Sequence, residues 1–194
     1  MSTERIIVHS SIATDFKAIL IETIKRTFGS DADTPVLITA AAARRNHALV
    51  ADAVHKGAKP LSIFGEDNAE NRDWLETKMR PVVLTNIDKS MDIYKHESFG
   101  PSVSLFTFET EANALDLAND TDYGLAASVF TDNFRDGFRF AESLQSGTVH
   151  INTMTVHDEF VLPHGGVKKS GFGRFNGYQG LEEFLYPKTV TWME

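Results

Sequence analysis

The sequence predicts an α/β fold in which a mainly parallel sheet carries helices on both faces. Apolar residues recur with a period that switches between two, as in strands, and about 3.6, as in helices. The strand-like segments are short and largely apolar, which is typical of parallel strands that are buried on both sides. No low-complexity stretch, internal repeat or linker interrupts the pattern, so we expect residues 1–194 to form a single domain.

The first half of the chain is expected to alternate strands with two long helices. A β-branched run over 5–9 predicts a strand, and Ser10 or Ser11 can cap the helix that follows it. Gly29 and Gly57 each stand where a helix is expected to end, since glycine is favoured just after the last turn. The expected elements are helices over 10–28 and 40–56, strands over 5–9, 60–64 and 81–85, and an exposed loop over 65–72.

The second half repeats the alternation. Thr110 is placed to cap a helix, and Phe138, Ala141 and Leu144 lie on one stripe of a later helix. In parallel sheets of this kind the ligand usually lies beyond the carboxyl ends of the strands. The expected elements are strands over 102–108, 125–131 and 147–152, helices over 110–119, 134–145 and 177–183, and an extended run over 189–193.

The composition excludes several classes of protein. The 194 residues include 19 Lys+Arg and 27 Asp+Glu, and the net charge of −8 argues against general nucleic-acid binding. The chain has 0 Cys, which excludes disulfide scaffolds, thiolate zinc sites and a cysteine nucleophile within it. No stretch approaches the ~18–20 uncharged apolar residues of a membrane span, and no signal peptide is recognisable, so the cytoplasm is the expected compartment.

Several catalytic and binding motifs are absent from the sequence. Without a G-x-S-x-G elbow, Ser170 is more typical of a turn than of a nucleophile. The glycines of 171–177 miss the dinucleotide fingerprint because Asn176 stands where a glycine is required, and 165–170 lacks the P-loop pattern. Metal binding is also disfavoured, because no pair of candidate ligands has a compact helical spacing. Those candidates are His150, His157, Asp158, Glu159 and His164.

One short segment, 96–101, combines residue types that suit a nucleotide. Glu97 and Phe99 stand two residues apart just before an expected strand, and at that spacing side chains of an extended segment project to one side. A carboxylate accepts hydrogen bonds from sugar hydroxyls, and an aromatic face suits a flat heterocycle. The alternative is a turn with a buried phenylalanine and a solvated glutamate, and the residues alone leave both interpretations open.

Taken in order, four segments resemble the aldehyde dehydrogenase superfamily. They read ESFGP at 97–101, LANDTDYGLAASVFT at 117–131, GTVHIN at 147–152 and PHGGVKKSGFGR at 163–174. The resemblance implies the C-terminal part of a catalytic domain and an oxidoreductase that converts aldehydes to carboxylic acids with NAD or NADP. Segment 154–159 and the pair Pro163-His164 are most similar to the branch that oxidises vanillin and salicylaldehyde, which implies aromatic aldehydes.

The resemblance also implies roles for particular residues. Glu97 would bond the hydroxyls of the nicotinamide ribose, and Phe99 would contact the nicotinamide. The loop 153–162 would line the aldehyde pocket, with His157 and Phe160 in its wall. The C-terminal run around 188–192 would pair with the sheet of a neighbouring subunit, since the family oligomerises through such a strand, so a homo-oligomer is expected.

The missing cysteine is the main departure from the family. Catalysis there needs a cysteine thiolate to attack the aldehyde and a glutamate base to activate water for the second step. The resemblance places that cysteine at or just upstream of Met1, and the cofactor-binding domain and the base further upstream.

We therefore expect no catalytic residue, no metal and no tightly bound cofactor in this chain, which alone would be inactive. Two readings remain open: part of a complete aldehyde dehydrogenase, or a non-catalytic truncated protein or pseudoenzyme that acts by association. A metal-dependent hydrolase is a distant third.

Overall fold

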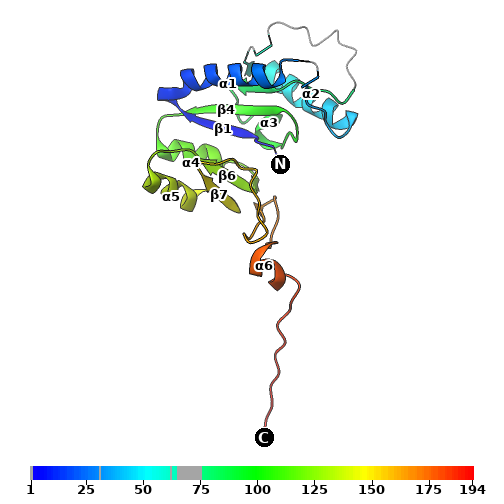
Figure 1. Cartoon of the computed structure of the whole chain (residues 1–194), viewed down its shortest axis with the longest axis vertical. Coiled ribbons are helices and arrows are strands. Elements are labelled where there is room, and N and C mark those ends of the chain that lie inside the picture. Colours follow the sequence, from blue (N-terminus) through cyan, green and yellow to red (C-terminus); the bar gives the residue numbers. More distant parts are fainter. Residues whose placement is uncertain (1, 31, 62, 65–75) are drawn as a thin grey trace. The chain divides into compact units, whose positions relative to one another are not determined.

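The computed structural model describes residues 2–30, 32–61, 63–64 and 76–194. The chain divides into two compact units, unit 1 (Met1–Ala118) and unit 2 (Asn119–Glu194) (Figure 1). The expectation of a single domain stays a prediction. None of the helices in the described part of the chain combines the length and the apolar character that a membrane span needs.

The secondary structure follows the expected alternation. Unit 1 contains β1 (Arg5–His9), the 3₁₀ turn η1 (Ser10–Ile12), α1 (Ala13–Phe28), α2 (Ala40–His55), β2 (Lys59–Pro60), β3 (Val82–Thr85), α3 (Asp92–Lys95), β4 (Ser102–Phe108) and α4 (Glu111–Asn119), which ends at the unit boundary. Unit 2 contains β5 (Tyr123–Gly124), β6 (Ala126–Val129), α5 (Phe134–Ser143), β7 (Thr148–Ile151), β8 (Val167–Lys168) and α6 (Gly177–Glu182).

The sheet of unit 1 has the strand order β1-β4-β3-β2. Strand β4 pairs in parallel with both β1 and β3, whereas β2 pairs antiparallel with β3 at the edge. The strand expected over 60–64 is only the two residues Lys59–Pro60, and it lies at the edge of the sheet, where a proline without an N–H is tolerated. The loop expected over 65–72 lies outside the described residues.

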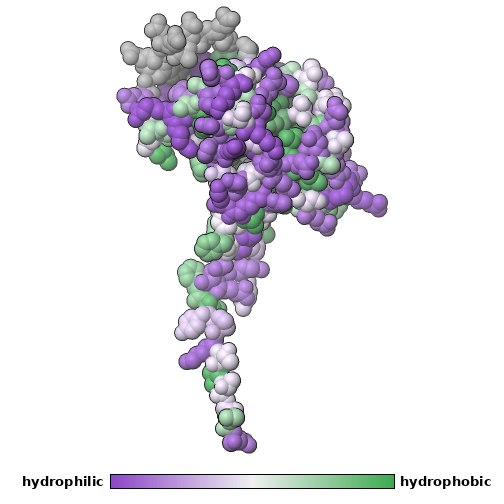
Figure 2. Space-filling view, turned by 180° about the vertical axis from the view of Figure 1, so that it is seen from behind, coloured by the Kyte–Doolittle hydropathy of each residue, from purple (hydrophilic) through white to green (hydrophobic). Residues whose placement is uncertain are grey.

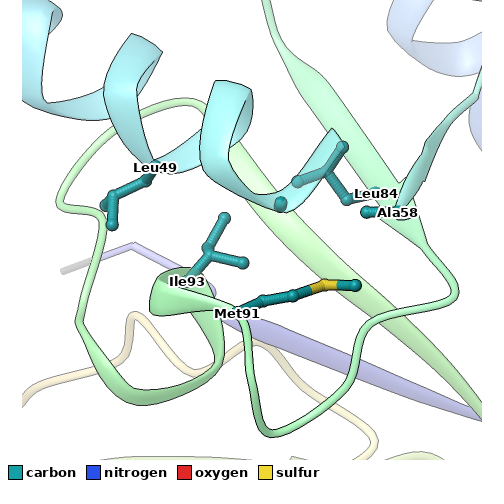
Figure 3. Close-up of a cluster of buried hydrophobic side chains, with 6 residues drawn as sticks. Leu49, Ala58, Leu84, Met91 and Ile93 are labelled. Atoms are coloured by element: carbon teal, nitrogen blue, oxygen red, sulfur yellow. The ribbon is translucent and has the colours of Figure 1, made fainter. Parts of the chain in front are cut away.

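Helices cover both faces of this sheet, as predicted. The consecutive residues Val83 and Leu84 are both buried, and consecutive strand side chains point to opposite faces. Val83 packs with Leu105 against apolar residues of α1, which lies alongside β4 and β1 (Figure 1). Leu84 packs on the other face with residues of α2 and α3, and Figure 3 shows Ile93 pointing from α3 toward the helix that carries Leu49.

The helix ends agree with the sequence in most places and differ at the start of α1. Instead of a serine cap, the 3₁₀ turn η1 precedes α1, and the His9 side chain accepts a hydrogen bond from the Ser11 amide at 3.2 Å. The Thr39 hydroxyl caps α2 by accepting from the Ala42 amide at 3.1 Å. Gly57 follows α2 with φ of 107°, a conformation that an L side chain rarely adopts.

Unit 2 contains the parallel strand pair β6-β7 and a small antiparallel strand pair, β5-β8. Helix α5 places Gly137 against Ile151 and Thr131, where an added Cβ would meet side-chain atoms at 3.2–3.4 Å. The Phe138 side chain is 49% exposed, and the closely packed Gly137 takes the inner position of this helix. The run 189–193 forms no strand, and hydrophobic side chains are exposed along this C-terminal segment (Figure 2).

Replacing Leu84 by alanine should destabilise the protein strongly. Leu84 is 0% exposed and joins the sheet to α2 and α3, so the truncation leaves a cavity that costs about 2–5 kcal/mol in the free energy of unfolding. Urea denaturation measures this change. The matched control is Ile38→Ala at a side chain that is 97% exposed, which should change the free energy by less than about 0.5 kcal/mol. Equal effects of the two variants would contradict this account of the core.

Candidate functional site

The segment 96–101 forms a loop between α3 and β4 in unit 1. Its backbone is not extended throughout, because Phe99 has φ of 49°, which is uncommon for a bulky residue. The Phe99 side chain is 63% exposed, whereas Glu97 is partly buried. The turn with a buried phenylalanine and a solvated glutamate is therefore wrong, and burial is the reverse of that alternative.

The Glu4 carboxylate holds this loop from the side of β1. Its two oxygens accept from the Ser98 amide at 2.9 Å, from the Ser98 hydroxyl at 3.2 Å and from the Phe99 amide at 3.1 Å. Hydrogen bonds to an ionised acceptor are stronger than neutral ones. Because the amide of Phe99 is bound, the left-handed backbone at this residue is fixed by a contact from a residue 95 positions away in sequence.

Helix α2 holds the same loop from another side. The Asn46 amide donates to the Ser98 carbonyl at 2.7 Å and accepts from the Ser102 hydroxyl at 2.6 Å, while Arg45 donates to the same carbonyl at 2.8 Å. Asn46 is 0% exposed, so these bonds satisfy a polar group that would otherwise be costly to bury. A Cβ at Gly100 would overlap the Asn46 side chain, which explains the glycine.

The sequence predicts Glu97 and Phe99 as cofactor-binding residues, which stays a prediction, and it points to neither Glu4 nor Asn46. A signal for Asn46 exists in the sequence, since it lies on the helical stripe of Ala43 and Ala53 that faces the core. A lone polar residue on a buried stripe indicates a satisfied internal hydrogen bond. No local pattern marks Glu4, because its partners are more than 90 positions distant.

The electrostatics of the loop suit a ligand with hydroxyl groups. Burial raises the pKa of the Glu97 carboxyl, and the neighbouring Glu4 charge raises this pKa further, whereas Arg45 opposes both effects. Among the described residues, the Glu97 carboxylate has no hydrogen-bond partner, and the Phe99 ring beside it is exposed. A free acceptor next to an open aromatic face fits a ribose with its attached heterocycle.

In unit 2, the predicted pocket residues lie on the loop 153–162. Asn152 begins it with φ of 56°, and its side chain both accepts from and donates to the Thr131 backbone at 2.8 Å. The Asn176 amide donates to Asp158 at 2.8 Å and so holds the middle of the loop. His157 is partly exposed, with its Nε2 3.2 Å from a Glu159 carboxylate oxygen, and Phe160 is largely exposed. Their role as pocket walls stays a prediction.

Three histidines of unit 2, His150, His157 and His164, lie close enough to act on one another. His150 on β7 is 9% exposed, and its Nε2 has no hydrogen-bond partner. The His157 ring meets it edge-on, with 5.4 Å between ring centroids, and burial together with His157 and His164 lowers the pKa of His150. No group of three or more ligating side chains that could hold a metal ion occurs within the described residues.

The histidine cluster predicts that acid destabilises the fold. His150 has a lowered pKa in the folded state, so below about pH 6.5 the unfolded chain binds a proton that the folded chain excludes. The contribution of neutral His150 to the free energy of unfolding is thus complete above about pH 6.5 and is lost as the pH falls below it. The melting temperature should fall on acidification, and less so in His150→Phe, which cannot titrate. The same substitution at exposed His47 should leave the pH dependence of the melting temperature unchanged. A curve for His150→Phe that runs parallel to that of the unaltered chain would refute the prediction.

Comparison with known proteins identifies the family. The sequence profile described as the aldehyde dehydrogenase family matches residues 1–190. Among curated relatives, a vanillin dehydrogenase from Pseudomonas fluorescens is 40% identical over 98% of the chain. A benzaldehyde dehydrogenase from Bacillus subtilis is 35% identical over 100% of it. The chain spans 39% of the length of each of these relatives.

Solved structures agree with this result. A salicylaldehyde dehydrogenase from Pseudomonas putida G7, complexed with salicylaldehyde, is 29% identical with a TM-score of 0.81 over 97% of this chain and 40% of its own. A betaine aldehyde dehydrogenase from Staphylococcus aureus, in complex with NAD+, is 35% identical with a TM-score of 0.80 over 98% of this chain and 40% of its own. The chain therefore belongs to the aldehyde dehydrogenase family, in the branch that includes the vanillin and salicylaldehyde dehydrogenases.

Proposed function

We propose that the chain forms part of the catalytic domain of an NAD- or NADP-dependent enzyme that oxidises aromatic aldehydes to carboxylic acids. The observation that carries the proposal is the loop 96–101, in which a free, partly buried carboxylate stands beside an exposed aromatic ring on a rigidly held backbone. The relatives act on vanillin, benzaldehyde and salicylaldehyde by their names. Because the chain spans about two fifths of the length of these relatives, the complete activity would also need the parts of the enzyme that the chain does not match.

Glu97 and Phe99 are the residues that would hold the dinucleotide. When bound, the nicotinamide supplies the acceptor for a hydride. The Glu97 carboxylate would accept hydrogen bonds from ribose hydroxyls, and the raised pKa of this group follows from the same partial burial that excludes competing water. Phe99 would orient the heterocycle with its exposed ring, while the backbone bonds of Ser98 keep both side chains in place.

The aldehyde would be bound in unit 2 by the loop 153–162. His157 and Phe160 give this loop one polar and one apolar ring, both accessible. An aromatic aldehyde carries a flat apolar ring with polar substituents, and this pair of side chains offers a stacking partner and a hydrogen-bonding nitrogen. Both residues act here by binding and orientation.

A chimera tests the proposal. Residues 1–194 would replace the matching segment of the Pseudomonas fluorescens vanillin dehydrogenase, and NADH or NADPH formation from vanillin and benzaldehyde would be followed by absorbance. The chimera should oxidise these aldehydes, whereas the isolated chain should not, because it holds 0 Cys to act as the nucleophile. A folded but inactive chimera contradicts the proposed function, and oxidation by the isolated chain contradicts the expected inactivity.

Within the chimera, Glu97→Gln should weaken dinucleotide binding. The amide keeps the size of the side chain but replaces a charged acceptor, so the KM for the dinucleotide should rise about tenfold with little change in the KM for the aldehyde. The control is Glu109→Gln, at an exposed glutamate outside the loop. An unchanged dinucleotide KM in Glu97→Gln would remove Glu97 from the binding site.

A second candidate is a non-catalytic protein that acts by association. The exposed apolar residues between Phe184 and Met193 favour it, since large exposed apolar segments mark interaction sites. The same segment would join subunits in a homo-oligomer under the first proposal. Light scattering of the isolated chain should show self-association that is lost when 184–194 are deleted, and a monomer at all concentrations would speak against association through this segment.

A further inference from the structure

We propose that Glu4 is a positioning residue for the dinucleotide, because its carboxylate ties the segment that precedes β1 to the loop that carries Glu97 and Phe99. The inference rests on the proposed function and deepens it. Glu4 itself touches neither the ribose nor the nicotinamide in this account. It acts through the backbone of Ser98 and Phe99, which it bonds directly.

The backbone of Glu4 is fixed independently of its side chain. Its carbonyl accepts from the Ser104 amide at 3.0 Å, so the residue is already aligned with β4 where β1 begins. The next residue, Arg5, donates to the carbonyls of Tyr94 and Leu117 at 2.7 Å and lies 4.5 Å from the centre of the Tyr94 ring. The Glu4 carboxylate therefore extends to the loop from a rigid base.

Both carboxylate oxygens are needed for the contact. One oxygen accepts from the Ser98 amide, and the other accepts from the Ser98 hydroxyl and the Phe99 amide. A neutral glutamine has one acceptor oxygen, and its NH₂ group would face an N–H. Glu4→Gln thus keeps the shape and removes at least one of the two amide contacts, which makes it a sharper test than a truncation.

The charge of Glu4 also acts on the loop. It raises the pKa of Glu97, the residue proposed to bind the ribose hydroxyls.

The first test uses the chain itself. Amide hydrogen exchange measured by NMR should show that Glu4→Gln loses about tenfold protection at Ser98 or Phe99, with the strands of the sheet unchanged. The matched control is Glu22→Gln, at an exposed glutamate of α1. In a separate NMR titration that follows the side-chain carboxyl carbons, Glu97 should titrate at lower pH in Glu4→Gln, because a neighbouring negative charge is gone. Unchanged exchange at both amides, or an unchanged Glu97 titration, overturns the inference.

The second test uses the chimera with vanillin dehydrogenase. Glu4→Gln should raise the KM for the dinucleotide several-fold while the KM for the aldehyde stays the same, and Glu22→Gln should change neither. A purely structural role would lower the amount of folded enzyme without this selectivity, so equal KM values refute positioning. If the unaltered chimera is inactive, the proposed function fails, whereas exchange and titration in the chain still decide whether Glu4 holds the loop.

Discussion

The buried hydrogen bonds of Asn46 are the interaction on which the candidate site depends. A side chain that is 0% exposed must satisfy its amide, and the Ser98 carbonyl and the Ser102 hydroxyl provide its two shortest hydrogen bonds, with a longer one to the Ala42 carbonyl. The requirement links three elements: α2, the loop, and the start of β4. Leu49 and Ala53 of the same helix anchor α2 on the sheet, so the apolar core determines where the amide stands and the amide determines where the loop stands.

The sequence predicted the parts of the fold that local patterns control. The strand over 102–108 was correct, and so were the start of the second helix at Ala40 and its end before Gly57, because apolar periodicity and helix-ending glycines act within a few positions. The strand over 60–64 was wrong, since pairing at a sheet edge depends on what the neighbour offers and on the missing N–H of Pro60. The start of α1 differed because His9, and not a serine, accepts the first amide.

The candidate site also combines features that local sequence patterns indicate with features that depend on distant residues. Glu97 and Phe99 could be proposed because they lie together in one short motif. The conformation of Phe99 could not be predicted, since its left-handed backbone goes with a hydrogen bond to Glu4 from far away in sequence. The sequence predicted that His150 lies in a strand. Its unpaired nitrogen and its lowered pKa arise only when the loop brings His157 against it.

The distribution of buried side chains differs between the two units. Among the described residues, every buried hydrophobic side chain lies in unit 1, while the polar residues His150 and His164 are the buried side chains of unit 2. Its large apolar side chains, such as Phe160 and Trp192, are exposed. Since burial of apolar surface is the dominant favourable term in folding, a unit whose large apolar side chains are exposed gains stability from whatever covers them. Under the proposed function, a bound aldehyde at one loop and a second subunit along the C-terminal segment would provide that cover.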